Sequence, residues 1–104
     1  MQTSGLLGAS ALIYTGPCRL RGVSLTADTV KSLTIRVEDN VTAVGTFVKA
    51  FGRASGGNVH ADTEGGACNF NKKWTKEDNL LCDRGLFATL SAEEGDYIIE
   101  FDPL

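Results

Sequence analysis

The chain has 104 residues, of which 42% are hydrophobic and 22% charged, and it carries a net charge of −3 at pH 7. This length is typical of one domain, and it leaves no room for separate catalytic and cofactor-binding domains. The acidic balance gives no general attraction to nucleic acid or anionic lipid, and no apolar run reaches the roughly 18 to 20 residues of a membrane span. We therefore expect neither a nucleic-acid partner nor a membrane partner.

The first eight residues differ in composition from the rest of the chain. Residues 1–8 are rich in Gly, Ser and Thr, and Leu6 and Leu7 are their apolar anchors. Such a composition is typical of a flexible terminus. We predict an N-terminal arm over residues 1–8 and a single domain over residues 9–104, and we take the two leucines as candidate contacts to a partner.

Two strands are predicted after the arm. Residues 9–14 are mostly apolar, and the Thr-Gly-Pro sequence at 15–17 ends them. In residues 18–25 the apolar positions change parity at Gly22. A glycine at a one-residue shift is typical of a β-bulge, although a strand whose surroundings change along its length gives the same pattern.

The middle of the chain contains the clearest strand pattern. Residues 33–38 alternate strictly between apolar and polar side chains, which indicates a strand with one buried face. Asp39 and Asn40 then form a predicted turn, and the β-branched and aromatic residues 46–51 form the next predicted strand. Residues 52–66 carry several glycines and few large apolar groups, so we predict a long exposed loop.

The last third of the chain contains four more predicted strands. Residues 67–71 and 80–82 are strand candidates, and the polar segment 72–79 between them has room for one short helical turn. Residues 86–90 and 97–101 alternate clearly, and we interpret them as a terminal hairpin joined by a tight connection.

This pattern of elements predicts the fold class. The chain shows roughly eight short strands, turn signals about every ten residues and no helical periodicity. We predict an all-β protein with a single antiparallel β-sandwich that resembles a jelly roll.

One polar cluster has the residue types of a metal site. His60, Asp62 and Glu64 alternate along the chain, so in an extended segment they would share a face. His60 is the only histidine, and glycine-rich loops commonly carry such residues for solvation. We predict no metal, no cofactor and no catalytic residue, and we keep His60 as a candidate partner contact.

The three cysteines are Cys18, Cys68 and Cys82. Their number is odd and their spacing contains no CxxC motif, so free thiols are the simplest interpretation. One disulfide with a leftover thiol is the alternative.

The segment Lys72-Lys73-Trp74 combines two basic residues with the only tryptophan. Such a combination can stack on a sugar ring or a base while it holds a phosphate. The alternative is structural, with Trp74 covering one end of the sandwich or lying in a subunit interface. In either case the three residues are candidate partner contacts.

Three segments give the chain a resemblance to a known class of proteins. They are GPCRLRGV at residues 16–23, VED at residues 37–39 and RGLFATL at residues 84–90, followed by a last strand. Together with the N-terminal arm, this arrangement resembles the small β-sandwich virion proteins of tailed bacteriophages, especially the capsid decoration or cement proteins. The resemblance implies a jelly-roll-like sandwich without a cofactor, made in the host cytoplasm and assembled into the virion. It also implies a homo-oligomer, often a trimer, that sits on the major capsid protein.

The leading functional hypothesis is therefore a non-enzymatic virion structural protein that decorates the phage head. A small carbohydrate-binding module with Trp74 as its platform is the alternative from another class. Within the class of virion proteins, a component of the neck, tail or fibre is a further alternative. A small enzyme is the third class of function, after the virion protein and the carbohydrate-binding module.

Overall fold

The computed structural model describes residues 1–28, 32–45, 47–55, 69–78 and 80–104. Within these residues the chain forms nine strands and one short 3₁₀ helix. In chain order they are β1 (Gln2–Thr3), β2 (Ala11–Thr15), β3 (Cys18–Ala27), β4 (Leu33–Glu38), β5 (Val48–Ala54), β6 (Phe70–Lys73), η1 (Lys76–Asp78), β7 (Leu81–Cys82), β8 (Gly85–Leu90) and β9 (Gly95–Pro103).

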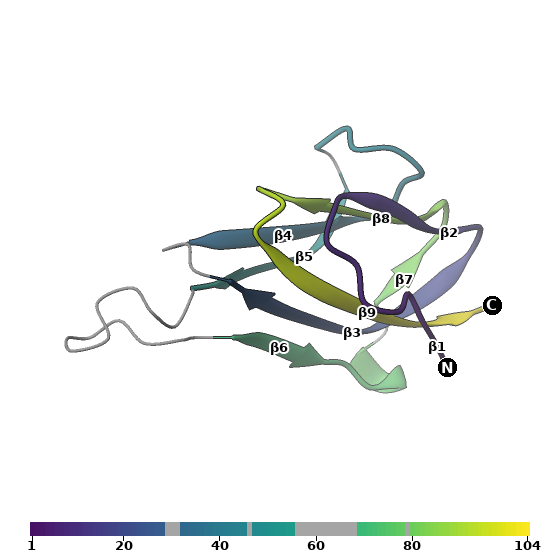
Figure 1. Ribbon diagram of the computed structural model, residues 1–104. Helices are drawn as coiled ribbons and strands as arrows, with labels where there is room; N and C mark the ends of the chain where they lie inside the picture. The colour runs from purple at the N-terminus through teal and green to yellow at the C-terminus, as the bar shows by residue number, and fades with distance from the viewer. Residues whose placement is uncertain (29–31, 46, 56–68, 79) are drawn as a thin grey trace.

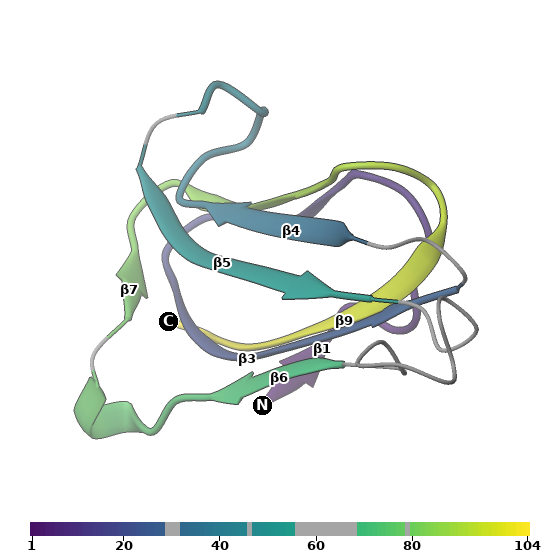
Figure 2. The same ribbon diagram turned by 90° about the vertical axis from the view of Figure 1, so that its left-hand side faces the viewer.

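The strands form two antiparallel sheets that face each other (Figures 1 and 2). Sheet A has the order β1-β9-β3-β6, with β7 also paired to β3, and sheet B has the order β2-β8-β4-β5. The pairs β1 with β9, β2 with β8, β3 with β6 and β4 with β5 match early strands with late ones. This is the pairing of a ribbon of two antiparallel chain halves rolled into a sandwich, which is a jelly roll. The predicted all-β sandwich is confirmed.

Three sequence patterns correspond directly to local structure. The apolar side chains of β4 at Leu33, Ile35 and Val37 are buried, as the alternation predicts. The pairing of β3 with β9 shifts by one residue between Leu20 and Gly22, which confirms the predicted bulge. The short helical turn predicted within residues 72–79 is η1.

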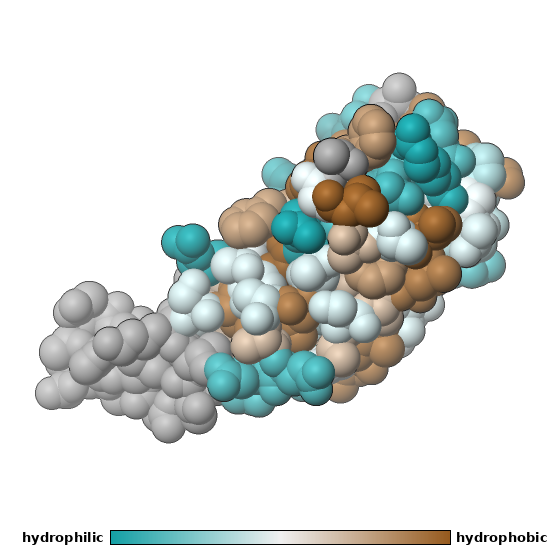
Figure 3. Space-filling model, turned by 90° about the horizontal axis from the view of Figure 1, so that it is seen from above, coloured by the Kyte–Doolittle hydropathy of each residue, from teal (hydrophilic) through white to brown (hydrophobic). Residues whose placement is uncertain are grey.

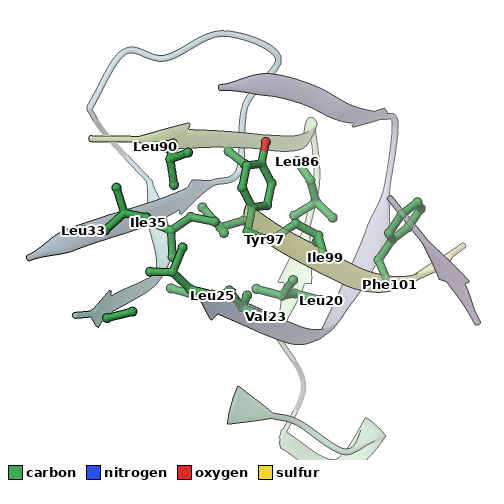
Figure 4. Packing of buried hydrophobic residues seen from close by; sticks show 14 of the residues in the cluster. Leu20, Val23, Leu25, Leu33, Ile35, Leu86, Leu90, Tyr97, Ile99 and Phe101 are labelled. Atoms are coloured by element: carbon green, nitrogen blue, oxygen red, sulfur yellow. The ribbon is translucent and has the colours of Figure 1, made fainter. Parts of the chain in front are cut away.

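The core lies between the two sheets and draws on both (Figure 4). Tyr97 of β9 is 1% exposed, and its hydroxyl donates a hydrogen bond of 2.7 Å to the carbonyl oxygen of Ala9, just before β2. Burial raises the pKa of Tyr97 to about 12, so the phenol stays neutral and remains a donor. The rings of Tyr14 in sheet B and Phe101 in sheet A lie 5.2 Å apart, which adds a second contact between the sheets.

The predicted terminal hairpin is wrong. β8 pairs with β2 and β4 in sheet B, whereas β9 pairs with β1 and β3 in sheet A. The short connection after β8 therefore crosses from one sheet to the other. Both strands do have one buried face, as their alternation indicates, but their partners are distant in sequence.

The predicted start of the long loop at residue 52 is also wrong. β5 continues to Ala54, and Gly52 is buried because the ring of Phe70 from β6 occupies the space where a side chain would be. A Cβ at Gly52 would meet that ring at 2.4 Å. The glycine therefore allows an edge strand of sheet B to approach an edge strand of sheet A. Residues 56–68 of the predicted loop lie outside the described residues.

Gly85 provides a test of the close approach between β2 and β8. A Cβ at this position would lie 2.3 Å from the carbonyl oxygen of Tyr14, and φ is +156°. We expect Gly85→Ala to lower the free energy of unfolding by about 2 to 3 kcal/mol through overpacking, measured by urea denaturation. The control is Gly45→Ala, where φ is +80° but no atom lies within 4 Å, with an expected loss of about 1 kcal/mol. Equal losses in the two variants would contradict the role of the contact with Tyr14.

Candidate binding surface

The predicted arm, residues 1–8, lies along β9 of the same chain. β1 pairs with β9, Ser4 exchanges hydrogen bonds of 2.8 and 2.9 Å with the backbone of Ile99, and Leu7 forms a bridge with Tyr97. Leu6 is 67% exposed, whereas Leu7 packs against the core. The segment thus covers an edge of sheet A, and a contact between it and a neighbouring subunit stays a prediction.

These contacts give truncation a defined cost. Deleting residues 1–8 removes the four backbone and side-chain hydrogen bonds of Ser4 and Leu7 to β9 and uncovers the edge of β9. We expect a net loss of about 2 to 3 kcal/mol in the free energy of unfolding, because the four bonds, at about 0.5 to 1.5 kcal/mol each, and the Leu7 contact are partly offset by the conformational entropy that the deleted residues no longer lose on folding. Thermal and urea denaturation measure it. A truncated protein that keeps its stability but loses attachment to a partner would instead support an arm that acts only between molecules.

The predicted contacts around Trp74 lie at the other edge of sheet A. Lys72 and Lys73 are exposed on β6, whereas Trp74 is half-buried and packs against the core. The backbone oxygen of Trp74 accepts a hydrogen bond of 2.9 Å from the Nε of Arg21. The Trp74 ring is therefore not presented as a free platform. Because β6 and β1 are at opposite edges of sheet A, the structure does not bring the Lys72–Trp74 segment and the N-terminal segment together. His60 lies outside the described residues.

Exposed apolar side chains gather on sheet B and on the loop that follows β4. We define the sheet B patch as Leu12, Val44, Phe47, Val48 and Phe51, whose side chains are 44 to 57% exposed. Figure 3 looks down on this side of the molecule and shows hydrophobic residues among hydrophilic ones. Several exposed apolar side chains on one side of a small domain make that side a candidate binding surface.

The pairing of strands places part of this patch in one row. Leu12 of β2 is opposite Phe87 of β8, Phe87 is opposite Glu38 of β4, and Glu38 is opposite Val48 of β5. Residues opposite one another in a sheet share a face, so the row crosses the outer face of sheet B. Phe51 lies one row further, opposite Arg36.

The acidic member of this row is covered by the loop. Glu38 is 0% exposed, although it lies on the outer face of the sheet. Its carboxylate accepts hydrogen bonds of 2.7 Å from the backbone N–H of Gly45 and 3.2 Å from the Nε of Arg36. A buried charge requires such partners. Glu38 therefore holds the loop that carries Val44 and Phe47 against the sheet.

A second buried acid, Asp39, ties the same loop to the start of β8. It is 4% exposed and accepts hydrogen bonds of 3.0 and 2.8 Å from the backbone N–H groups of Asp83 and Arg84, and a longer one of 3.4 Å from Gly85. Burial raises the pKa of the Asp39 carboxyl, but the three N–H donors and the nearby Arg84 charge outweigh it and hold the pKa below its ordinary value.

Phe47 is held in an unfavourable backbone conformation while its ring stays exposed. Its φ is +55°, in the left-handed region that bulky residues rarely adopt, and its side chain is 54% exposed. Its carbonyl oxygen accepts a hydrogen bond of 2.9 Å from the N–H of Asp39, and the guanidinium of Arg84 stacks over the ring at 4.2 Å. Strain of this kind is typical of functional positions.

Sequence reasoning did not identify this surface. It interpreted Asp39 as an ordinary turn residue and counted Phe47 and Phe51 as strand residues. One signal was present: two successive acids, Glu38 and Asp39, end the clearest amphipathic strand and stand before an apolar segment. An acid directly after a buried strand can serve backbone donors at the end of a sandwich.

Cys18 and Cys82 are buried free thiols on paired strands, as predicted, and Cys68 lies outside the described part of the chain. No group of three or more His, Cys, Asp or Glu side chains that could hold a metal ion occurs among the residues the structure describes. In that part of the chain, no helix has the length and hydropathy needed to cross a bilayer.

Comparison of the chain with protein-family models, curated proteins and solved structures finds no significant match.

Proposed function

We propose that the chain is a non-enzymatic structural protein of a bacteriophage virion, which decorates the capsid as a homo-oligomer, a trimer. The sheet B patch is the observation that carries this proposal. Its phenylalanines are exposed, and two buried acids hold the loop that presents one of them. Rigid exposed aromatic side chains are characteristic anchors of protein interfaces.

The fold supports the proposal by analogy. Jelly rolls recur in viral capsid proteins and in lectins, so the strand order favours binding functions of these two kinds. The described residues divide between a closed core and surfaces suited to contact. When many copies of a small protein bind one particle as oligomers, avidity strengthens the attachment beyond that of each modest contact.

The lectin analogy keeps a carbohydrate-binding module as the second candidate. Its predicted platform, Trp74, packs against the core and is half-buried, so it offers little ring surface to a sugar. The exposed rings of Phe47 and Phe51 are the better platform for stacking. We place this candidate second because these rings lie among aliphatic side chains, whereas sugar sites also need a set of polar donors and acceptors.

The decisive experiment is particle composition. Phage particles whose genome encodes this chain are purified on a density gradient, and the chain is quantified against the major capsid protein by mass spectrometry. We expect the chain at a fixed ratio to the capsid protein and released as a trimer by light scattering. A chain that remains in the lysate, with none in the particle, would overturn the proposal. A few copies per particle would indicate the neck, tail or fibre instead.

A further inference from the structure

A basic pocket lies at the end of sheet A, away from the sheet B patch. Its volume is about 470 Å³, and it is lined by Met1, Arg19, Arg21, Lys76, Asp102, Pro103 and Leu104. The two ends of the chain lie at this end of the molecule, near β9 and η1 (Figure 1). Three cationic side chains face one carboxylate, so two positive charges are in excess, on a chain whose net charge is −3.

Arg19 is the residue of this pocket whose Nε atom has no hydrogen-bond partner among the described residues. It lies on β3, opposite Asp102 of β9 and Leu81 of β7. Its Nε atom is buried, and among the described residues no acceptor reaches it. Buried donors of charged groups are almost always hydrogen-bonded, because losing water without a replacement is unfavourable. Nε itself is closed to solvent, so an anion in the pocket would stabilise the guanidinium through its charge and its other N–H groups.

Arg21 of this pocket already binds a carboxylate, that of Asp102. Its Nη1 donates a bond of 2.5 Å to Asp102 while its Nε donates to the backbone oxygen of Trp74, so the guanidinium is fixed from two sides. Asp102 also lies 3.4 Å from the α-amino nitrogen of Met1. The hydrogen bond from Arg21 holds the pKa of Asp102 below its ordinary value despite some loss of solvent, so Asp102 stays ionised near neutral pH.

Asp102 pairs with both Arg21 and the α-amino group of Met1, so the cationic side chains of the pocket without an ion-pair partner among the described residues are Arg19 and Lys76 of η1. Lys76 is exposed and adaptable, whereas Arg19 is anchored in a strand. A guanidinium presents its N–H groups as a planar fork that matches two oxygens of a carboxylate or a phosphate. A guanidinium fork beside an exposed ammonium is well suited to a small oxyanion.

We propose that this pocket is an oxyanion-binding site, in which the guanidinium of Arg19 binds a carboxylate or phosphate group and Lys76 supplies a second positive charge. The site is independent of the proposed capsid function, because it lies on sheet A and uses none of the residues of the sheet B patch.

The test is titration of the full chain, followed by amide NMR shifts at pH 7. Succinate and inorganic phosphate are the two probes, and chloride at matched ionic strength is the control. We expect saturable shifts at Arg19, Arg21 and Lys76 with at least one of the probes and not with chloride. Tighter binding of succinate assigns the site to carboxylates, and tighter binding of phosphate assigns it to phosphate groups.

The variants distinguish a site from general charge attraction. Arg19→Gln should weaken binding by about tenfold or more, since a charge-assisted hydrogen bond is lost. Arg53→Gln, which removes an exposed arginine of β5, should leave binding unchanged. Arg19→Lys keeps the charge without the fork and should also weaken binding, and Lys76→Gln serves if the Arg19 variants do not fold. Equal binding by Arg19→Gln and the parent chain, or the same shifts with chloride, would overturn the proposal.

Discussion

Asp39→Ala is expected to lower the free energy of unfolding by about 3 to 5 kcal/mol, because buried N–H donors lose a charged acceptor together. The donors are the backbone groups of Asp83 and Arg84, with a longer contact to Gly85. Their position at the start of β8 means that the loss loosens the connection between the two sheets. Urea denaturation at pH 7 measures the effect.

Two variants serve as controls for this prediction. Asp39→Asn keeps one acceptor oxygen but no charge, so its free energy of unfolding should lie between that of the parent chain and that of Asp39→Ala. Asp96→Ala removes an exposed aspartate of β9 and should change stability by less than about 0.5 kcal/mol. If Asp39→Ala were no more destabilised than Asp96→Ala, the carboxylate would not organise this end of the sandwich.

The same carboxylate predicts a pH dependence. Its folded-state pKa lies below the ordinary value of 3.8, so the folded state binds the proton less readily than the unfolded state. The stability that the Asp39 carboxylate contributes is therefore fully present at pH values above 3.8. It is lost as pH falls from 3.8 toward the lower folded-state pKa. Asp102 is shifted in the same direction. We therefore expect Asp39→Asn to show a shallower fall in stability between about pH 5 and pH 2 than the parent chain, without abolishing the fall.

Strands could be predicted where the pattern depends on burial alone. The alternation in β4 shows which side chains face the core, and the parity change at Gly22 shows where β3 bulges. Both signals are local, because a strand with one wet face must alternate whatever its partner. The sandwich followed from the number of such strands.

Strand partners could not be predicted in the same way. β8 and β9 are adjacent in sequence, and a short connection favours a hairpin. In a jelly roll, however, the partner of β9 is β1, at the opposite end of the chain. The short connection then joins the sheets. Alternation identifies the buried face of a strand but carries no information about its neighbours.

The candidate surface escaped prediction because its determinants are also distant in sequence. The sequence predicts Glu38 on the polar face of a strand and Asp39 in a turn, and it does not show that the N–H groups of Gly45 and Arg84 lie against them. The sequence predicts Gly52 as the start of a loop, because it does not show that the ring of Phe70 packs against this glycine. The two interpretations of Trp74 stayed open for the same reason, since the core residues against which its ring packs are distant in sequence.

The double variant Phe47→Gly/Phe51→Ser is expected to weaken attachment to the capsid by about 30-fold or more, because the loss of even one aromatic anchor of an interface costs about 2 kcal/mol or more. Both side chains are more than half exposed, so neither is required by the core. Glycine suits the φ of +55° at position 47, and the relief of about 1 kcal/mol offsets the lost stacking of Arg84 on the ring. The free energy of unfolding should therefore stay within about 1 kcal/mol of the parent value.

The measurement is sedimentation of the purified protein with capsids that lack it, over a series of concentrations, with light scattering of the free protein in parallel. Leu6→Ser is the matched control, since this side chain is 67% exposed but lies outside the sheet B patch. We expect Leu6→Ser to bind as the parent chain does. If Leu6→Ser lost attachment while the double variant kept it, the N-terminal segment would be the capsid contact and the patch would not. If the double variant remained bound to capsids but no longer formed trimers, the patch would be the contact between subunits, because outer faces buried in a trimer cannot also face the shell.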